Sequence, residues 1–376
     1  MPYPSLFGVV LLAVAANAQT FVVDVNNGPG TDFTTMHSAT ATVPSGSVLL
    51  VRAGAYDGFT IDGKSMRVLA QPGVLLQPSQ GNRIDIVNLA ANQQVLISNF
   101  SCTSSPGVPA CEVRGANCQG RILLDDWQLV APLQSSFSVF EFSDCDQVVI
   151  RSLQRAPGAR ASASFDQGNT VLEQCSFGFG FVWGLGDTII VTGGTMQMTD
   201  CFADVQGIAP NHAVFLNNAA LRVGGASDLT GAIGGAPQFA IGGTGTVRVD
   251  PSVTFGSMAI APSLAATTVA MPQVVSSFAG GQAQAVLDGP LQQLGALLVA
   301  LPGPVSTLPG IVDAFWLDAS STLFLGFGVM APGSPVTSSF PWNGSFGPGI
   351  PVIWQGLSFD VVGGFQISPP SLLVLP

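Results

Sequence analysis

The stretch from Gly30 to Ala70 reads GTDFTTMHSATATVPSGSVLLVRAGAYDGFTIDGKSMRVLA. It predicts a short helix that is capped by Asp32 and ends before Pro44, since a capping residue and a proline commonly bound a helix. Short apolar strands then alternate with turns that contain glycine. The predicted strands are 21–25, 48–51, 59–61 and 66–69, and the predicted turns include 54–56 and 62–64.

Residues 21–70 resemble the opening cap and first coil of pectin methylesterases and other pectin-lyase-like proteins. The resemblance implies an all-β fold, a right-handed parallel β-helix. Because many unrelated activities share this opening, it implies no particular function.

The middle of the chain repeats one strand pattern, in which apolar residues lead to a short polar or turn-prone residue. Successive repeats are 18 to 27 residues apart, a period typical of a coiled solenoid. Asn and Asp suit the bend because they tolerate left-handed backbone. We therefore expect a β-helix over residues 19–256; a β-sandwich of irregular strands is the alternative. The polar positions are Asn99, Asp126, Ser152, Gln174, Asp200 and Asn218.

Residues 257–376 contain few charges and many Gly, Pro, Ala and Val residues. Short apolar runs between Gly/Pro turns predict a separate small β-sandwich. The tail from Ile350 resembles a C-terminal β module of large exported bacterial proteins, and its position suggests a role in surface attachment or sorting. The predicted strands are 294–301, 311–317, 323–327, 352–355, 357–361 and 372–375.

The N-terminus predicts a signal peptide over residues 1–18. Leu6 to Ala16 is apolar, and Ala16-Asn17-Ala18 is a small-x-small cleavage site. No Lys or Arg precedes the apolar run, which departs from the usual pattern. A membrane anchor is the alternative, but the run is too short to span a bilayer. We therefore expect a secreted or cell-surface protein with no transmembrane segment after signal removal.

Composition narrows the possible partners. Acidic residues outnumber basic ones 22 to 11, and Lys64 is the only lysine, so binding to nucleic acid is not expected. No C-x-x-C motif and only two histidines, His37 and His212, occur, so we predict neither a metal site nor a cofactor. Neither histidine has an acid or cysteine at the spacing of a nucleophilic triad, and both are interpreted as non-catalytic. Most of the five tryptophans are expected in the core.

Six cysteines lie within one hundred residues, and export would allow them to form disulfides. Places in the repeat predict the pairs Cys118–Cys145 and Cys175–Cys201, and Cys102–Cys111 is predicted because the two residues flank a loop with two prolines. Buried free thiols are the alternative.

The enzyme motifs of the resembled families are missing. Pectin methylesterases carry Gln-Asp-Thr, Asp-Phe-Ile-Phe-Gly and Gly-Arg-Pro-Trp, none of which occurs, and Asp57 stands where that family has Glu. Polygalacturonase-like enzymes use an adjacent Asp pair with a His and an Arg-Ile-Lys motif. Asp125-Asp126 is the only such pair here, and neighbouring strand residues point to opposite faces.

The residues one position before the polar bend positions form a column that we expect to face outward. This column consists of Ser98, Asp125, Arg151, Glu173, Thr199 and Asn217. Asp125, Arg151 and Glu173 would stack on consecutive coils, with the two acids roughly 9–10 Å apart. That separation is near the upper end for an inverting glycosidase, about 6.5–9.5 Å. The three are candidate catalytic residues; a solvated salt-bridge ladder contributing about 0–1 kcal/mol per contact is the alternative.

Taken together, these features favour an exported non-enzymatic β-helix protein that binds polysaccharide or a cell-surface glycan, or serves as a surface structural element. The rival hypothesis is a polysaccharide lyase or glycoside hydrolase acting through the Asp125/Arg151/Glu173 column.

Overall fold

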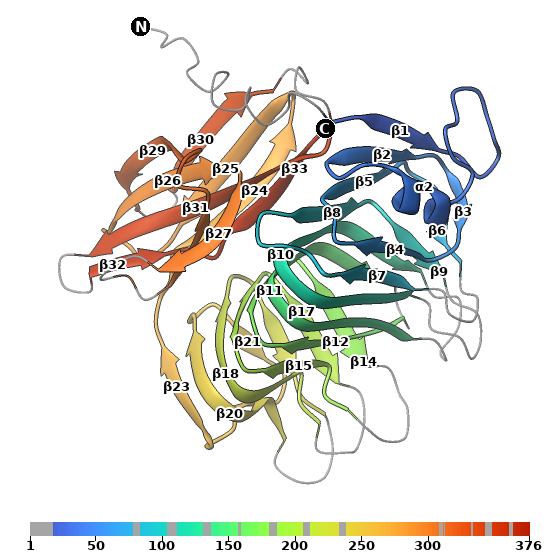
Figure 1. Ribbon diagram of the computed structural model, residues 1–376. Helices are drawn as coiled ribbons and strands as arrows, with labels where there is room; N and C mark the ends of the chain where they lie inside the picture. Colours follow the sequence, from blue (N-terminus) through green and yellow to red (C-terminus); the bar gives the residue numbers. More distant parts are fainter. Residues whose placement is uncertain are drawn as a thin grey trace, which may run out of the picture. The chain divides into compact units, whose positions relative to one another are not determined.

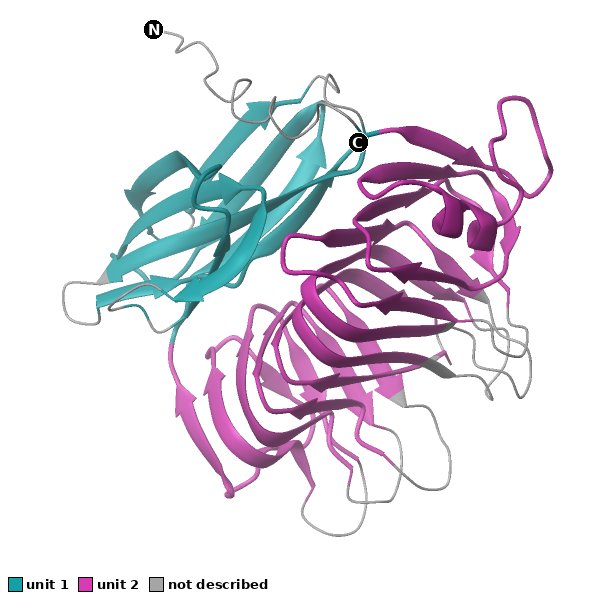
Figure 2. Cartoon of the chain, in the orientation of Figure 1, with its two compact units in different colours: residues 1–18, 270–376 teal, residues 19–269 magenta. Residues whose placement is uncertain are grey.

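A computed structural model defines the fold and divides the chain into two compact units (Figure 2). Residues 19–269, which are magenta and labelled unit 2 in Figure 2, are called the first unit below, and residues 270–376, which are teal and belong to unit 1 in Figure 2, are called the second unit. Residues 1–17 of the predicted signal peptide lie outside the described residues. Residues described by the structure are 18–77, 83–103, 111–130, 137–156, 159–179, 186–205, 211–232, 238–307, 311, 313–331, 334–342, 348–360 and 364–376.

The first unit contains the predicted helix, α2 (Met36–Thr42), after one strand. Its N-cap is Thr35, whose side chain accepts a hydrogen bond from the Ser38 amide, so the prediction of Asp32 as the cap is wrong. Asp32 instead accepts a hydrogen bond from the Val22 amide. At the other end, the ammonium group of Lys64 donates to three backbone carbonyls between residues 40 and 43. The single lysine therefore caps the C-terminal end of the helix.

The rest of this unit is built from strands (Figure 1). Their bounds are β1 (Thr20–Val23), β2 (Ser47–Val51), β3 (Gly54–Tyr56), β4 (Phe59–Asp62), β5 (Met66–Ala70), β6 (Val74–Leu76), β7 (Ile84–Val87), β8 (Gln94–Ser98), β9 (Ser101–Thr103), β10 (Cys111–Val130), β11 (Phe137–Arg155), β12 (Arg160–Asp166), β13 (Asn169–Glu173), β14 (Ser176–Phe179), β15 (Ile189–Thr192), β16 (Thr195–Thr199), β17 (Phe202–Val205), β18 (Val214–Gly224), β19 (Asp228–Thr230), β20 (Phe239–Val249), β21 (Thr254–Phe255), β22 (Met258–Ile260) and β23 (Leu264–Thr268). The predicted turn at 54–56 is the short strand β3.

These strands stack in parallel, coil upon coil, as a β-helix requires. One stack runs β1, β2, β5, β8, then through β10, β11, β13, β16, β18 and β20 to β23. A second runs from β4 through β7, β10, β11, β12 and β15 to β18 and β20. The predicted β-helix is confirmed, and the alternative of an irregular sandwich in this region is wrong.

Alternate residues of each strand point into the coil and form one continuous core. Trp127 lies in it with no exposed surface, between Phe100 at 5.6 Å and Phe140 at 6.2 Å, measured between ring centroids. Three of the other tryptophans are also buried, in the second unit, as expected, and Trp183 lies outside the described residues.

The bend residues have left-handed backbone, as predicted. Their φ angles range from 52° to 65° at Asn99, Asp126, Ser152, Gln174 and Asp200. The sixth predicted member is wrong. Thr199 pairs with Gly224, so Gly225, with φ 67°, continues this column. Asn218 belongs to a different bend, because the strand that precedes it pairs with Ile189–Thr192.

The solenoid extends beyond residue 256, where we expected its end. Strands β22 and β23 both pair in parallel with β20, so coiling continues to Thr268. The drop in charge at that point of the sequence therefore precedes the change in fold.

The second unit is antiparallel, as the Gly/Pro-punctuated strands predict. One sheet contains β24, β25 and β30, and another contains β29, β26, β31, β32 and β33. Apolar residues of both sheets, such as Leu287 and Trp354, share one core, which makes the unit a sandwich. The strand bounds are β24 (Gln273–Ala279), β25 (Gln282–Asp288), β26 (Leu294–Ala300), β27 (Pro302–Thr307), β28 (Ala314–Leu317), β29 (Leu323–Val329), β30 (Val336–Pro341), β31 (Ile350–Asp360), β32 (Gly364–Ile367) and β33 (Ser371–Leu375).

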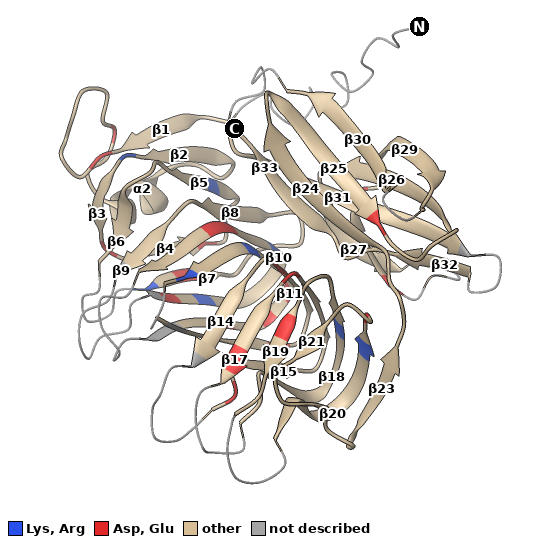
Figure 3. Ribbon diagram, turned by 180° about the vertical axis from the view of Figure 1, so that it is seen from behind, with Lys and Arg blue, Asp and Glu red and all other residues tan. Residues whose placement is uncertain are grey.

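Charge is distributed unequally between the units (Figure 3). Residues 270–376 contain four aspartates and neither Lys, Arg nor Glu. The side-chain ion pairs of the described residues all lie in the first unit. No helix in the described part of the chain is long and apolar enough to cross a membrane.

Candidate functional site

The predicted column of charges is formed by strands β10, β11 and β13, which follow one another in the stack. Asp125 pairs in register with Arg151, and Arg151 pairs with Glu173. Ser98 and Thr199 occupy the same position on the coils at either end. The structure therefore brings the three candidate residues together on consecutive coils, as predicted. Asn217 is not part of the column, because Gly224 pairs with Thr199 in its place.

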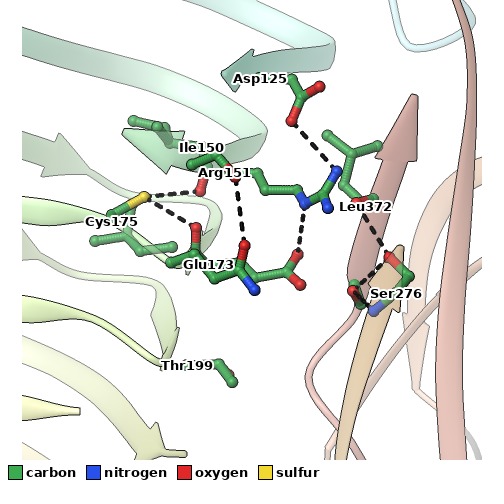
Figure 4. Close-up of polar contacts among 12 residues, drawn as sticks. Asp125, Ile150, Arg151, Glu173, Cys175, Thr199, Ser276 and Leu372 are labelled. Carbon is green, nitrogen blue, oxygen red and sulfur yellow. Dashed lines mark hydrogen bonds and ion pairs between the residues drawn. The ribbon is translucent and has the colours of Figure 1, made fainter. Parts of the chain in front are cut away.

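The guanidinium group of Arg151 lies between the two carboxylates (Figure 4). Its Nη1 is 3.5 Å from Oδ1 of Asp125, and its Nε is 3.9 Å from Oε2 of Glu173. One cation thus forms ion pairs with two acids, and its side chain occupies the space between them.

The column lies on the side of the sheet opposite the interior core, because the preceding residue on each coil (Leu124, Ile150, Leu172) belongs to that core. It is not solvated, however. The side chains of Asp125, Arg151 and Glu173 are only 9%, 13% and 2% exposed. The ion pairs of the predicted ladder are formed, and at this low exposure the charges depend on one another more than solvated charges would.

Burial raises the pKa of Asp125 to about 6, although the positive charge of Arg151 acts in the opposite direction. In an unfolded chain an Asp has a pKa of about 3.9. Between these two values the folded state holds a proton that the unfolded state has released. Stability is therefore expected to fall as pH rises from about 4 to about 6, by up to about 3 kcal/mol from this one group.

Asp125→Asn is expected to remove this contribution. Denaturant unfolding at pH 4 and pH 7 should show a smaller difference in the free energy of unfolding for the variant than for the wild type. Other titrating groups are common to both proteins and cancel in the comparison. Equal differences in the two proteins would contradict the raised pKa.

The neighbouring acid, Asp126, is separate from this site. It is an exposed bend residue with φ 52°, so Asp125-Asp126 does not present two carboxylates to one substrate. This confirms the sequence argument against a polygalacturonase-like acid pair.

An Asp–His pair was missed by the sequence reasoning. Nδ1 of His212 lies 2.8 Å from Oδ1 of Asp187, and the same oxygen accepts the His212 backbone amide at 2.7 Å. The two residues are 25 positions apart, which is one coil, and that spacing was the available signal. The pair orients the imidazole ring. His37, by contrast, is exposed as expected.

Four of the cysteines are buried free thiols, so the predicted pairs Cys118–Cys145 and Cys175–Cys201 are wrong. Cys118 and Cys145 do stand in register on adjacent coils. Parallel in-register side chains keep the strand spacing of about 4.8 Å, whereas disulfide Cβ atoms approach to about 3.8 Å. The side chain of Cys111 lies outside the described residues, so the pair with Cys102 stays a prediction.

The Cys175 thiol is protonated and unreactive. Burial raises the pKa of Cys175, and its sulfur donates a hydrogen bond to the carbonyl of Ile150 at 3.2 Å (Figure 4). A protonated, buried thiol is neither a nucleophile nor a metal ligand. Among the described residues, no group of three or more His, Cys, Asp or Glu side chains is arranged to hold a metal ion.

In comparisons with known proteins, the chain matches no protein family and no curated protein.

Proposed function

We propose that this chain is an exported, non-enzymatic β-helix protein that binds polysaccharide or forms a structural element of the cell surface. The observation that carries the proposal is the position of Arg151 between the two candidate acids. An inverting glycosidase leaves room for a water and a sugar between its carboxyl groups, about 6.5–9.5 Å apart. Here the guanidinium group lies between the two carboxylates and forms an ion pair with each of them.

The fold supports a binding role. A solenoid presents the same bend on successive coils, so polar side chains recur along its length and can contact successive units of a polymer. Export is supported by the apolar segment Leu6 to Ala16 and the small residues that follow it.

The rival proposal is a polysaccharide lyase or glycoside hydrolase that uses Asp125, Arg151 and Glu173. It is favoured by the raised pKa of Asp125, because a carboxyl group with a pKa closer to neutral pH is better suited to act as a general acid.

A panel of neutral and acidic polysaccharides, assayed for retention and for product release, tests the proposal. Retention without new reducing ends or unsaturated products is the expected result. Product release that is lost in Asp125→Asn and Glu173→Gln would establish the rival, and release that persists in both would indicate an enzyme at another site. If no polysaccharide is retained, glycan binding is rejected.

A further inference from the structure

A second bend column runs along the solenoid. It consists of Asn88, Asn117, Asp144 and Gln167, whose φ angles lie between 52° and 65°. The residue before each of them pairs in parallel with its neighbour on the next coil, so the four bends lie on four consecutive coils. Left-handed backbone at each position turns all four side chains out of the coil at the same corner.

These bends line a pocket of about 470 Å³, together with Gln119 and Asp146. All six side chains are exposed. Asn88 donates to a carboxylate oxygen of Asp62 at 2.9 Å. Within the described part of the chain, the other five side chains make no hydrogen bond to protein. The pocket therefore presents several amide and carboxylate groups that are available to a ligand.

The backbone forms part of the pocket wall because Gly168, with φ 76°, allows close approach of the coils. A Cβ atom at this position would collide with the carbonyl oxygen of Cys145. The main chain at Gly168 thus forms part of the wall, and polar side chains lie around it. A polar concavity of this kind can position a ligand through a few directed hydrogen bonds.

We propose that this pocket binds a neutral, hydroxyl-rich segment of a glycan chain. Amide side chains donate and accept hydrogen bonds, and carboxylates accept them, which matches sugar hydroxyl groups. Among the described residues that line the pocket, none is basic and two are aspartates, so an acidic sugar such as a uronate is repelled. This inference rests on the proposed glycan binding and adds the site and the class of glycan.

The test combines two pocket substitutions, Asn117→Gly and Gln167→Gly. Glycine accepts positive φ without strain, so the side chains are removed while the bends are kept. The matched control is Asp126→Gly with Gln174→Gly in the other bend column, where φ is 52° and 54°. Circular dichroism checks that both double variants remain folded.

Binding is measured by affinity electrophoresis and titration calorimetry with galactomannan, xyloglucan and mixed-linkage β-glucan as neutral probes, and with polygalacturonate as the acidic probe. We expect at least one neutral probe to bind. Its affinity should be about tenfold lower for the pocket variant than for the wild type, and unchanged for the control. Unchanged binding by the pocket variant would reject this site while keeping glycan binding. Preference for polygalacturonate would overturn the neutral class, and binding of no probe would overturn the proposed function itself.

Discussion

Arg151→Met is expected to lower the free energy of unfolding by about 3–5 kcal/mol at pH 7, since it leaves two buried carboxylates without the cation between them. The side chains of Asp125 and Glu173 are 9% and 2% exposed, so water cannot replace the guanidinium group. The loss should shrink toward pH 5, because an uncompensated carboxylate takes up a proton.

Arg114→Met is the matched control. Arg114 also lies in an ion pair across adjacent coils, 2.8 Å from Oε2 of Glu141, but these side chains are 43% and 40% exposed. Its removal is expected to cost less than about 1 kcal/mol. Denaturant unfolding of both variants without any glycan measures the difference. Equally small losses would show that the Arg151 column behaves as a solvated surface pair.

Trp127→Ala is expected to destabilise the β-helix by about 3–5 kcal/mol, the range for removing a large aromatic side chain from a packed core. The indole ring is fully buried and stacks on Phe100, and its Nε1 donates to the carbonyl of Ile97 at 3.3 Å. Removal would therefore open a cavity at the centre of the coil stack and leave a buried carbonyl without this donor.

Trp127→Phe serves as the graded control. It keeps a ring in the aromatic stack and removes only the indole nitrogen and part of the volume, so a smaller loss is expected. Unfolding followed by far-ultraviolet circular dichroism is the suitable measurement, because it does not depend on the tryptophan that is removed. A loss in Trp127→Ala no greater than in Trp127→Phe would contradict tight packing of this ring.

Glycan binding at the pocket and catalysis at the charge column require different features of the β-helix. Binding at the Asn117 and Gln167 bends needs only exposed polar side chains held in register, which the solenoid provides. Catalysis at Asp125 and Glu173 needs space for substrate beside the carboxylates, where Arg151 lies. The pocket and the charge column lie at different positions on each coil, so substitutions in one can be tested without changing the other.

The sequence by itself determined the β-helix, its bends from Asn99 to Asp200 and the stacking of Asp125, Arg151 and Glu173. These features are local to each repeat: apolar alternation specifies which residues face inward, and short polar residues mark left-handed bends. The antiparallel character of the second unit followed similarly from short apolar runs between turns.

Only the tertiary structure decided features that depend on register between coils of unequal length. A loop of different length changes which residues pair between neighbouring coils. Asn218 therefore lies outside the column predicted for it, and His212 contacts Asp187. The low exposure of the charge column and the free state of Cys118 and Cys145 were also decided by the tertiary structure, because side-chain exposure and side-chain direction are not local properties of one repeat.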